Sequence, residues 1–489
     1  MTKREISLDV LRGLAIIGMV LSGTISRNPE LPSWLFHAQI PPPDFDFNTN
    51  LPGITWVDLV FPFFLFAMGM AFPFSLSKMV DKGASNKAIT RRIIIRAFKL
   101  FFFAVMLGHL SPFHYPQELG WLRYFMGFMA FVGFFLAFAK FPPLSKHENK
   151  LNLLGYALLI ALVMIRAWHF ELTFSIHNHD IIILVLSNMA LFGGLIWLFT
   201  RNNWYIRLGI MALYFALRLT HSIDDSWNQM LWDFTPFKWL AATFPAFYES
   251  MLNIGIDLKS TIFYHPDYLK YLLIVIPGSI AGDLIKWGLR EKASARYHPG
   301  ERVFGFVAFL LLVNVCLNLW GLLSRNLDFV WIMNIVSVLI LLKATGTGSF
   351  KHLRYNRSLL LWSIFWLLLG LVFEAYEGGI KKDSATISYF LMTSGMAGFM
   401  IVCFKILEPV LQPGKVLGFI GQIGVNPMLG YVAAVYCVMP LLYFLQVLPW
   451  IDQWHLHWPW AGLLRGILLT ALMIILTVWS VKLKYYWKT

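Results

Sequence analysis

The chain is short of charged residues and of cysteine, and each shortage excludes a class of protein. Only 13% of its 489 residues are charged, whereas a soluble domain has about 25%, so the composition excludes an ordinary soluble protein. Three cysteines are too few for a disulfide scaffold, and all of them lie in apolar runs without metal-ligand spacing. We therefore expect Cys316, Cys403 and Cys437 to be buried thiols that pack as small apolar side chains.

What replaces charge is a series of long apolar runs. The chain is 58% hydrophobic, and runs of about 18 or more apolar residues are long enough to cross a bilayer as helices. They are continuous rather than alternating, which favours helices over a β-barrel. We predict an all-α polytopic membrane protein with about fourteen spans, in which residues 1–489 form one domain. The predicted spans are 8–25, 54–77, 92–110, 121–140, 151–168, 181–200, 207–220, 268–289, 302–323, 327–343, 358–376, 386–407, 420–446 and 461–483.

The basic residues predict the orientation of these spans. If the N-terminus is cytoplasmic, roughly three quarters of the 40 Lys and Arg fall on the cytoplasmic side, as the positive-inside rule requires. Both termini are then cytoplasmic, and 26–53 and 221–266 are outer loops. Within the second loop, "KWLAATFPAFYESMLNIGI" has the length and composition of an amphipathic helix. The first run has no cleavage site behind it, so we expect a retained helix in the plasma (inner) membrane. The net charge of +14 is explained by topology, and we expect no nucleic-acid partner.

Ionisable residues within or beside spans are candidates for function, because they are costly in a membrane. Asp9 and Arg12 lie three residues apart on one face of the first helix. Asp58, Arg123 and Glu374 lie near the outer mouths of spans, as does Lys382. For each residue, a structural ion pair or a snorkelling side chain is the alternative to a role in a site.

Histidines suggest two further kinds of site. His37 lies in the first outer loop, where an imidazole can act as a general base or a nucleophile near neutral pH. The pairs His177 with His179 and His455 with His457 have metal-like spacing, but neither has the third and fourth ligands of a zinc site. We therefore expect no metal.

Several segments follow one another in the order found in a known family. They begin with "SLDVLRGLAIIGMVL", a histidine, and "LPGITWVDLVFPFFLFAMG". Later come "LRYF", "HPDYLKYLLIVIPGSIAGDLI", "IKKDSATISYFLMTSG" and "GVNPMLGYV". Together they resemble the heparan-α-glucosaminide N-acetyltransferase family, whose members are transmembrane acyltransferases. The chain departs from the family pattern near Ser22, at Ala385 and near Ala434, in an insertion at 40–50, and in two additional helix pairs near 151–200 and 302–343 beyond a ten-helix core.

The resemblance implies a reaction and a set of roles. The donor would be cytoplasmic acetyl-CoA, and the acceptor would be an amino sugar of the glucosamine or heparan type on the outer side. His37 would be catalytic with Asp58 beside it. The family pattern assigns donor binding to Arg12, Arg123, Lys382, Ser388 and Asn426, and acceptor binding to Asp9, Glu374 and Tyr389.

Three questions stay open at this stage. The sequence does not separate a general-base role for His37 from a nucleophilic one, and it leaves homodimerisation open. Fourteen spans with embedded charges also describe a secondary transporter for a sugar or oligosaccharide, although transporters usually contain internal repeats and paired broken helices. A scaffold without chemistry is a third reading, and it leaves His37 and its charged neighbours unexplained.

Overall fold

Every regular element that the structure describes is a helix. The computed structural model describes residues 5–291, 302–346, 354–408, 416–455 and 458–487. Within these ranges the β-structure is one isolated bridge between Ala139 and Trp487. Thirteen of the described helical segments are long and apolar enough to cross a membrane. The protein is therefore an all-α, multi-pass integral membrane protein, as the composition predicts.

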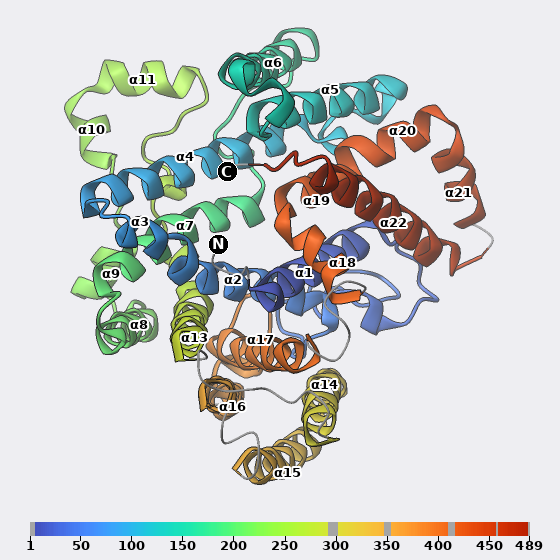
Figure 1. Cartoon of the computed structure of the whole chain (residues 1–489). Helices are drawn as coiled ribbons and strands as arrows, with labels where there is room; N and C mark the ends of the chain where they lie inside the picture. The colour runs from blue at the N-terminus through green and yellow to red at the C-terminus, as the bar shows by residue number, and fades with distance from the viewer. Residues whose placement is uncertain (1–4, 292–301, 347–353, 409–415, 456–457, 488–489) are drawn as a thin grey trace. The chain divides into compact units, whose positions relative to one another are not determined.

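The chain divides into two compact units, shown together in Figure 1. Unit 1 comprises residues 1–77, 273–434 and 441–486. Unit 2 comprises residues 78–272 together with 435–440 and 487–489. Each unit is described separately below.

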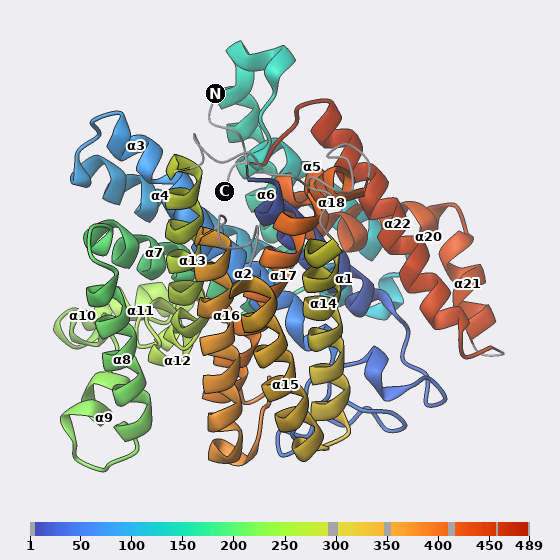
Figure 2. The same cartoon turned by 60° about the horizontal axis from the view of Figure 1, so that its bottom comes forward.

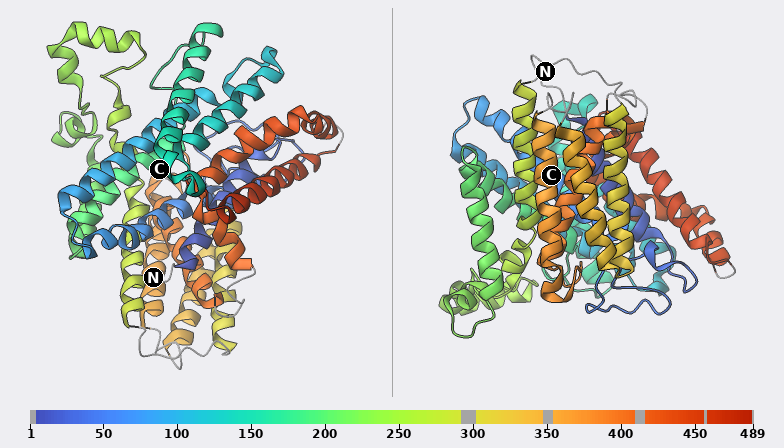
Figure 3. Two further views of the ribbon diagram at one scale, coloured as in Figure 1. Left: turned by 45° about the horizontal axis from the view of Figure 1, so that its top comes forward. Right: turned by 90° about the horizontal axis from the view of Figure 1, so that it is seen from below.

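Unit 1 is built around α17 (Ile387–Leu407), of whose most apolar stretch 83% is buried. This helix packs against α16 and α14, and also against α1 and α2. Figures 2 and 3 show α13 to α17 as neighbouring, roughly upright helices. The other helices of this unit are α1 (Ile6–Thr24), α2 (Trp56–Ser75), α13 (Leu272–Glu291), α14 (Arg302–Leu323), α15 (Leu327–Gly346), α16 (Arg354–Val372), α18 (Val416–Val425), α19 (Pro427–Ala433), α20 (Met439–Phe444), α21 (Val447–His455) and α22 (Ala461–Lys482).

Two glycines allow α13 to approach α2 very closely. A Cβ at Gly278 would overlap the carbonyl oxygen of Phe66, and one at Gly282 would lie 2.5 Å from the carbonyl oxygen of Met70. Gly-x-x-x-Gly spacing is a common way for membrane helices to pack, since small residues let backbones meet. The contact fixes α2, which carries Asp58, within unit 1.

Unit 2 contains two prominent packed pairs, α4 with α7 and α5 with α6. Between α8 and α13 the chain forms only short helices. The helices of this unit are α3 (Ser77–Asp81), α4 (Asn86–Leu110), α5 (Trp121–Phe138), α6 (Glu148–His169), α7 (Ile181–Thr200), α8 (Trp204–Thr220), α9 (Trp227–Trp232), α10 (Lys238–Thr243), α11 (Pro245–Asn253) and α12 (Pro266–Leu269).

The structure corrects the sequence-based boundaries in three places. The predicted span 207–220 is α8, whose 17 residues are not among the thirteen spans. The predicted span 420–446 is not one helix, because Asn426 has non-helical dihedrals (φ −128°, ψ 56°) and separates α18 from α19. The amphipathic helix expected from Lys238 is likewise divided, at Phe244, into α10 and α11. Both breaks immediately precede a proline, whose ring disfavours the helical conformation in the residue before it.

Candidate active site

The loop between α1 and α2 is cross-linked by its own hydrogen bonds. Gln39 is fully buried, and its Nε2 donates to the carbonyl oxygens of Leu51 at 2.9 Å and Gly53 at 3.1 Å. The N–H of Asn48 donates to the carbonyl oxygen of Gln39 at 2.9 Å. These bonds tie the middle of the loop to its last residues, so His37 is carried by an ordered segment.

Asp58 joins this loop to the start of α2. It is the third residue of the helix and is completely buried. Its Oδ2 accepts from the N–H of Thr55 at 2.8 Å, from the hydroxyl of Thr55 at 3.3 Å and from the N–H of Ala38 at 3.3 Å. The Thr55 contact belongs to a capping box, which satisfies backbone donors at a helix start. One carboxylate oxygen therefore holds the helix start and the residue after His37.

The other oxygen of Asp58 faces the imidazole. His37 Nδ1 lies 2.7 Å from Asp58 Oδ1, a short distance typical of a charge-assisted bond. With Nδ1–H donated to the carboxylate, the ring has the tautomer in which Nε2 carries the lone pair. The His37 side chain is 30% exposed while that of Asp58 is 0% exposed. The pair thus has a buried orienting group and a partly accessible base.

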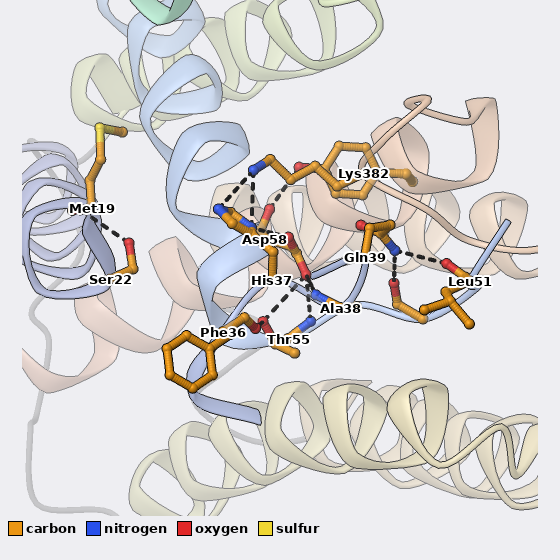
Figure 4. A network of polar contacts seen from close by, with 12 residues as sticks. Met19, Ser22, Phe36, His37, Ala38, Gln39, Leu51, Thr55, Asp58 and Lys382 are labelled. Carbon is orange, nitrogen blue, oxygen red and sulfur yellow. Dashed lines mark hydrogen bonds and ion pairs between the residues drawn. The ribbon is translucent and has the colours of Figure 1, made fainter. Parts of the chain in front are cut away.

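Lys382 completes the cluster (Figure 4). Its Nζ lies 3.0 Å from His37 Nδ1 and 3.2 Å from Nε2. The two ring nitrogens flank Cε1, and an in-plane Nζ at these distances would collide with that carbon. The ammonium therefore lies over the ring edge rather than in line with either nitrogen lone pair.

The segment that carries Lys382 is anchored at both ends. Ile387 N–H donates to Glu377 Oε2 at 2.6 Å, and Lys381 N–H donates to the hydroxyl of Thr386 at 3.0 Å. The Thr386 hydroxyl also lies 3.0 Å from that of Ser388. These bonds shape the turn into α17.

Tyr389, in the first turn of α17, reaches the same site. Its hydroxyl is buried and donates to the backbone carbonyl oxygen of Asp58 at 2.7 Å. The structure thus brings four sequence-predicted residues into one set of contacts. His37, Asp58 and Lys382 meet through side chains, and Tyr389 supports the backbone.

Asp9 and Arg12 lie at another depth of unit 1. Arg12 Nη1 is 3.6 Å from Asp9 Oδ1, and Nη2 donates to the carbonyl oxygen of Ala67 in α2 at 3.4 Å. Ala67 is nine residues beyond Asp58, which is about 14 Å along a helix at 1.5 Å per residue. The pair is therefore well separated from His37.

Asn426 lies at the break between α18 and α19. Its Nδ2 donates to the carbonyl oxygen of Tyr485 at 2.9 Å and to the Ser480 hydroxyl at 3.4 Å. The neighbouring Gly424 packs directly on the backbone of Asp9. Asn426 therefore belongs with the Asp9 end of α1 rather than with His37.

Two further predicted residues have identified partners. Glu374 accepts from Arg325 Nη1 at 2.7 Å. Arg123 belongs to unit 2, where its Nη2 donates to the Tyr124 hydroxyl at 3.1 Å and its guanidinium lies over that ring.

The two histidine pairs were considered as metal ligands. Among the described residues, no group of three or more His, Cys, Asp or Glu is arranged to hold a metal ion. His177 Nε2 lies 4.0 Å from Asp257 Oδ2, and His179 Nδ1 lies 3.1 Å from the carbonyl oxygen of Ile176. His457 lies outside the described residues.

Sequence reasoning missed several residues of the site. Thr55 has a recognisable signal, since Thr-x-x-Asp before an apolar run is a capping-box pattern. Gln39 and Arg325 have no such signal, because their partners are backbone carbonyls and a residue 49 positions away. Only the fold brings these groups together.

Comparison with known proteins places the chain without naming an activity. No curated protein matches it. A family model described as "Domain of unknown function (DUF5009)" matches residues 4–256, just over half of the 489 residues, and this stretch includes His37 and Asp58. On that match, the chain belongs to the DUF5009 family.

Proposed function

We propose that this protein is a membrane acyltransferase. It moves an acetyl group from cytoplasmic acetyl-CoA to the amino group of a glucosamine-type or heparan-type sugar outside the plasma (inner) membrane. The observation that carries the proposal is the 2.7 Å contact between His37 Nδ1 and buried Asp58 Oδ1. A buried carboxylate that fixes the tautomer of a partly exposed imidazole is the arrangement of a base in acyl transfer.

His37 is assigned the role of general base. The sugar nitrogen attacks the carbonyl carbon of the thioester, and its proton passes to His37 Nε2. The bond between carbon and sulfur then breaks, and CoA leaves as a thiolate that accepts the proton from the imidazolium. Asp58 keeps the ring oriented and stabilises the imidazolium while it exists.

Lys382 supplies positive charge where the reaction needs it. The tetrahedral intermediate carries a negative oxygen, and a preorganised cation beside it lowers the barrier in a site shielded from water. The ammonium lies within 3.2 Å of both ring nitrogens, so an acetyl group that reaches His37 also reaches Lys382. Ser388 contributes indirectly, because its contact with Thr386 helps to shape the turn that follows Lys382.

The charge distribution supports a cytoplasmic donor. CoA is a polyanion, and the proposed inner face has most of the basic residues of a chain with net charge +14. Arg12 and Asn426 lie at the Asp9 end of α1, which this orientation puts on the inner side. They are assigned to the donor, and the acetyl end extends outward to His37.

The central test is the loss of the base. His37→Ala is expected to lower acetyl transfer by about 10²–10⁴-fold while CoA binding is retained. His177→Ala, in which a histidine with a 53% exposed side chain is removed, serves as the control and should transfer acetyl normally. Transfer of radiolabelled acetyl to glucosamine by detergent-purified protein measures both variants. Near-normal turnover in His37→Ala would exclude the mechanism.

Sidedness is tested in sealed right-side-out vesicles. Acetyl-CoA loaded inside should acetylate an acceptor outside, and acetyl-CoA added only outside should be used poorly. The orientation itself is checked with single cysteines in intact cells, where one at Asn48 should react with an impermeant thiol reagent and one at Ser85 should not. Equal use of external and internal donor would show that the reaction occurs on one face.

One feature favours the alternative class of sugar transporter. The helix break at Asn426, followed by a π-helical segment at Ala434–Val438, is the kind of irregularity that transporters place at a substrate site. Proteoliposomes distinguish the two functions. A transporter exchanges labelled sugar across the membrane without acetyl-CoA, whereas the proposed enzyme releases CoA only when donor and acceptor are both present.

A further inference from the structure

An ion pair links the α14–α15 hairpin to the loop that carries Lys382. Arg325 lies in the turn of this hairpin, and its Nη1 donates to Glu374 Oε1 at 2.7 Å. Glu374 follows α16 at the start of the outer loop, and its side chain is only 8% exposed, against 35% for Arg325. Because the carboxylate is withdrawn from water, removing its partner costs more than breaking a surface pair does.

The backbone of Gly379 packs directly against this ion pair and against Pro52. Gly379 has φ +99°, and a Cβ there would lie 2.7 Å from Pro52 Cβ, 3.1 Å from Glu374 Oε1 and 3.3 Å from Arg325 Nη1. No side chain larger than hydrogen fits between these groups. The ion pair therefore holds the loop after α16, at Gly379, in contact with Pro52 in the segment that leads into α2.

A second glycine, Gly53, lies where the loop after α16 meets the segment that leads into α2; we call this meeting point the junction. The N–H of Gly53 donates to the carbonyl oxygen of Ile380 at 2.8 Å. Gly53 has φ +121°, and a Cβ there would lie 3.0 Å from the carbonyl oxygen of Leu322, the penultimate residue of α14. Three segments thus meet directly: the entry to α2, the tip of the α14–α15 hairpin, and the loop that carries Lys382.

The hairpin itself is stiffened by an asparagine network. Asn314 and Asn318 of α14 and Asn334 of α15 are all fully buried. Asn334 Nδ2 donates to Asn318 Oδ1 at 2.7 Å, and Asn314 Nδ2 donates to Asn334 Oδ1 at 3.1 Å. Such bonds between membrane helices hold the two helices in register, so the tip that carries Arg325 is a firm support.

The junction is close to the candidate site along the chain. Ile380 precedes Lys382 by two residues, and Gly53 precedes Asp58 by five. Lys382 and Asp58 both contact the imidazole of His37, one over its ring and the other at Nδ1. A shift of the junction is therefore transmitted to both partners of the imidazole.

We infer that Arg325 and Glu374 are positioning residues that hold Lys382 over His37. The α14–α15 hairpin, one of the two helix pairs beyond the ten-helix core, thus contributes to the site without touching substrate. The kinetic part of this inference rests on the proposed acetyl transfer, whereas the placement of Lys382 does not.

The test combines a chemical and a kinetic measurement. Arg325→Ala and Glu374→Gln should increase the rate at which diethyl pyrocarbonate modifies His37 severalfold, measured by mass spectrometry of its peptide, because Lys382 no longer covers the ring. The same variants should lower kcat by about 10²-fold, the effect of a displacement of about 1 Å, with the acceptor KM little changed. The exchanged pair Arg325→Glu with Glu374→Arg should recover most of both.

The control is Asp452→Asn, which breaks an ion pair of similar length in the same unit, from Arg465 Nε to Asp452 Oδ1 at 2.8 Å. It should alter neither measurement. If Arg325→Ala does not fold, Arg325→Lys takes its place, since it keeps the charge without the planar fork.

The inference would be overturned if Arg325→Ala and Glu374→Gln changed neither the rate of His37 modification nor kcat. It would also be overturned if Asp452→Asn changed both measurements as much as these variants do. If the wild-type protein transfers no acetyl, the proposed function fails, and the rate of His37 modification alone decides whether the ion pair places Lys382.

Discussion

Replacing Asp58 by asparagine should separate the two tasks of this residue. In the native side chain, Oδ2 accepts from Thr55 and Ala38 while Oδ1 accepts from His37. An amide has only one oxygen. Because the two backbone N–H groups can only donate, the amide oxygen of the Asp58→Asn variant should take the place of Oδ2, and its NH₂ group should face the imidazole.

The consequence is a change of tautomer. An NH₂ group donates to Nδ1, so the ring proton moves to Nε2, the nitrogen that must accept the proton of the sugar amine. The same exchange in a serine-protease triad lowers kcat by about 10⁴-fold, and we expect a loss of that order for Asp58→Asn. Donor KM should change little, because Asp58 does not contact the donor in the proposed reaction.

Asp58→Ala should behave differently, since it also removes the helix cap. The N–H groups of Thr55 and Ala38 then lose their acceptor, at a cost of about 1–3 kcal/mol for each buried N–H left without one. The alanine variant should therefore melt well below the asparagine variant in detergent, and both should be inactive. Asp58→Asn with turnover within about tenfold of wild type would refute the assignment of Asp58 as the group that sets the tautomer.

Two further predictions concern stability, each measured by thermal unfolding in detergent. Gly278→Ala should lower the melting temperature, with a cost of about 1–3 kcal/mol from overpacking against the Phe66 carbonyl, whereas Gly305→Ala, with no atom within 4 Å of the new Cβ, should cause no loss. Burial lowers the pKa of His265 from its ordinary 6.5, and its Nδ1 accepts from the N–H of Asp267. The unfolded chain then binds the proton of His265 more tightly than the folded one. The free energy of unfolding is therefore unaffected by this group above pH 6.5 and decreases as the pH falls below that value. His265→Asn, which keeps a capping acceptor, should remove that decrease.

Most spans were predictable from apolar runs, and thirteen candidates among the described residues compare with about fourteen predicted, but the continuity of the helices was not predictable. Pro62 and Pro73 lie inside α2, which continues through both, whereas Pro245 and Pro427 each begin a new helix. A proline removes one backbone donor in all four cases. Neighbouring helices decide whether the freed carbonyl finds another partner, and a single sequence does not contain that information.

The sequence indicated several residues of the site, but it did not indicate most of the contacts between them. His37 and Asp58 are separated by 21 positions and lie around one loop, so their proximity was a reasonable prediction. Lys382 lies 345 positions from His37; its position near a span made it a candidate, but only the resemblance linked it to His37. The resemblance implied acceptor binding for Glu374, whereas the structure pairs it with Arg325, which no pattern near either residue indicates and which gives it a positioning role instead.

The chemistry and the fold of this site depend on the same carboxylate. Asp58 lies in the first turn of α2, where a negative charge is favoured by the exposed N–H groups and by the helix dipole. A helix start inside a membrane protein needs such a cap in any case, because water does not reach its donors. Since capping occupies only Oδ2, Oδ1 is left to orient His37. A requirement of the fold thus places a buried acceptor beside a partly exposed imidazole, and the proposed reaction uses a carboxylate that helix capping already requires.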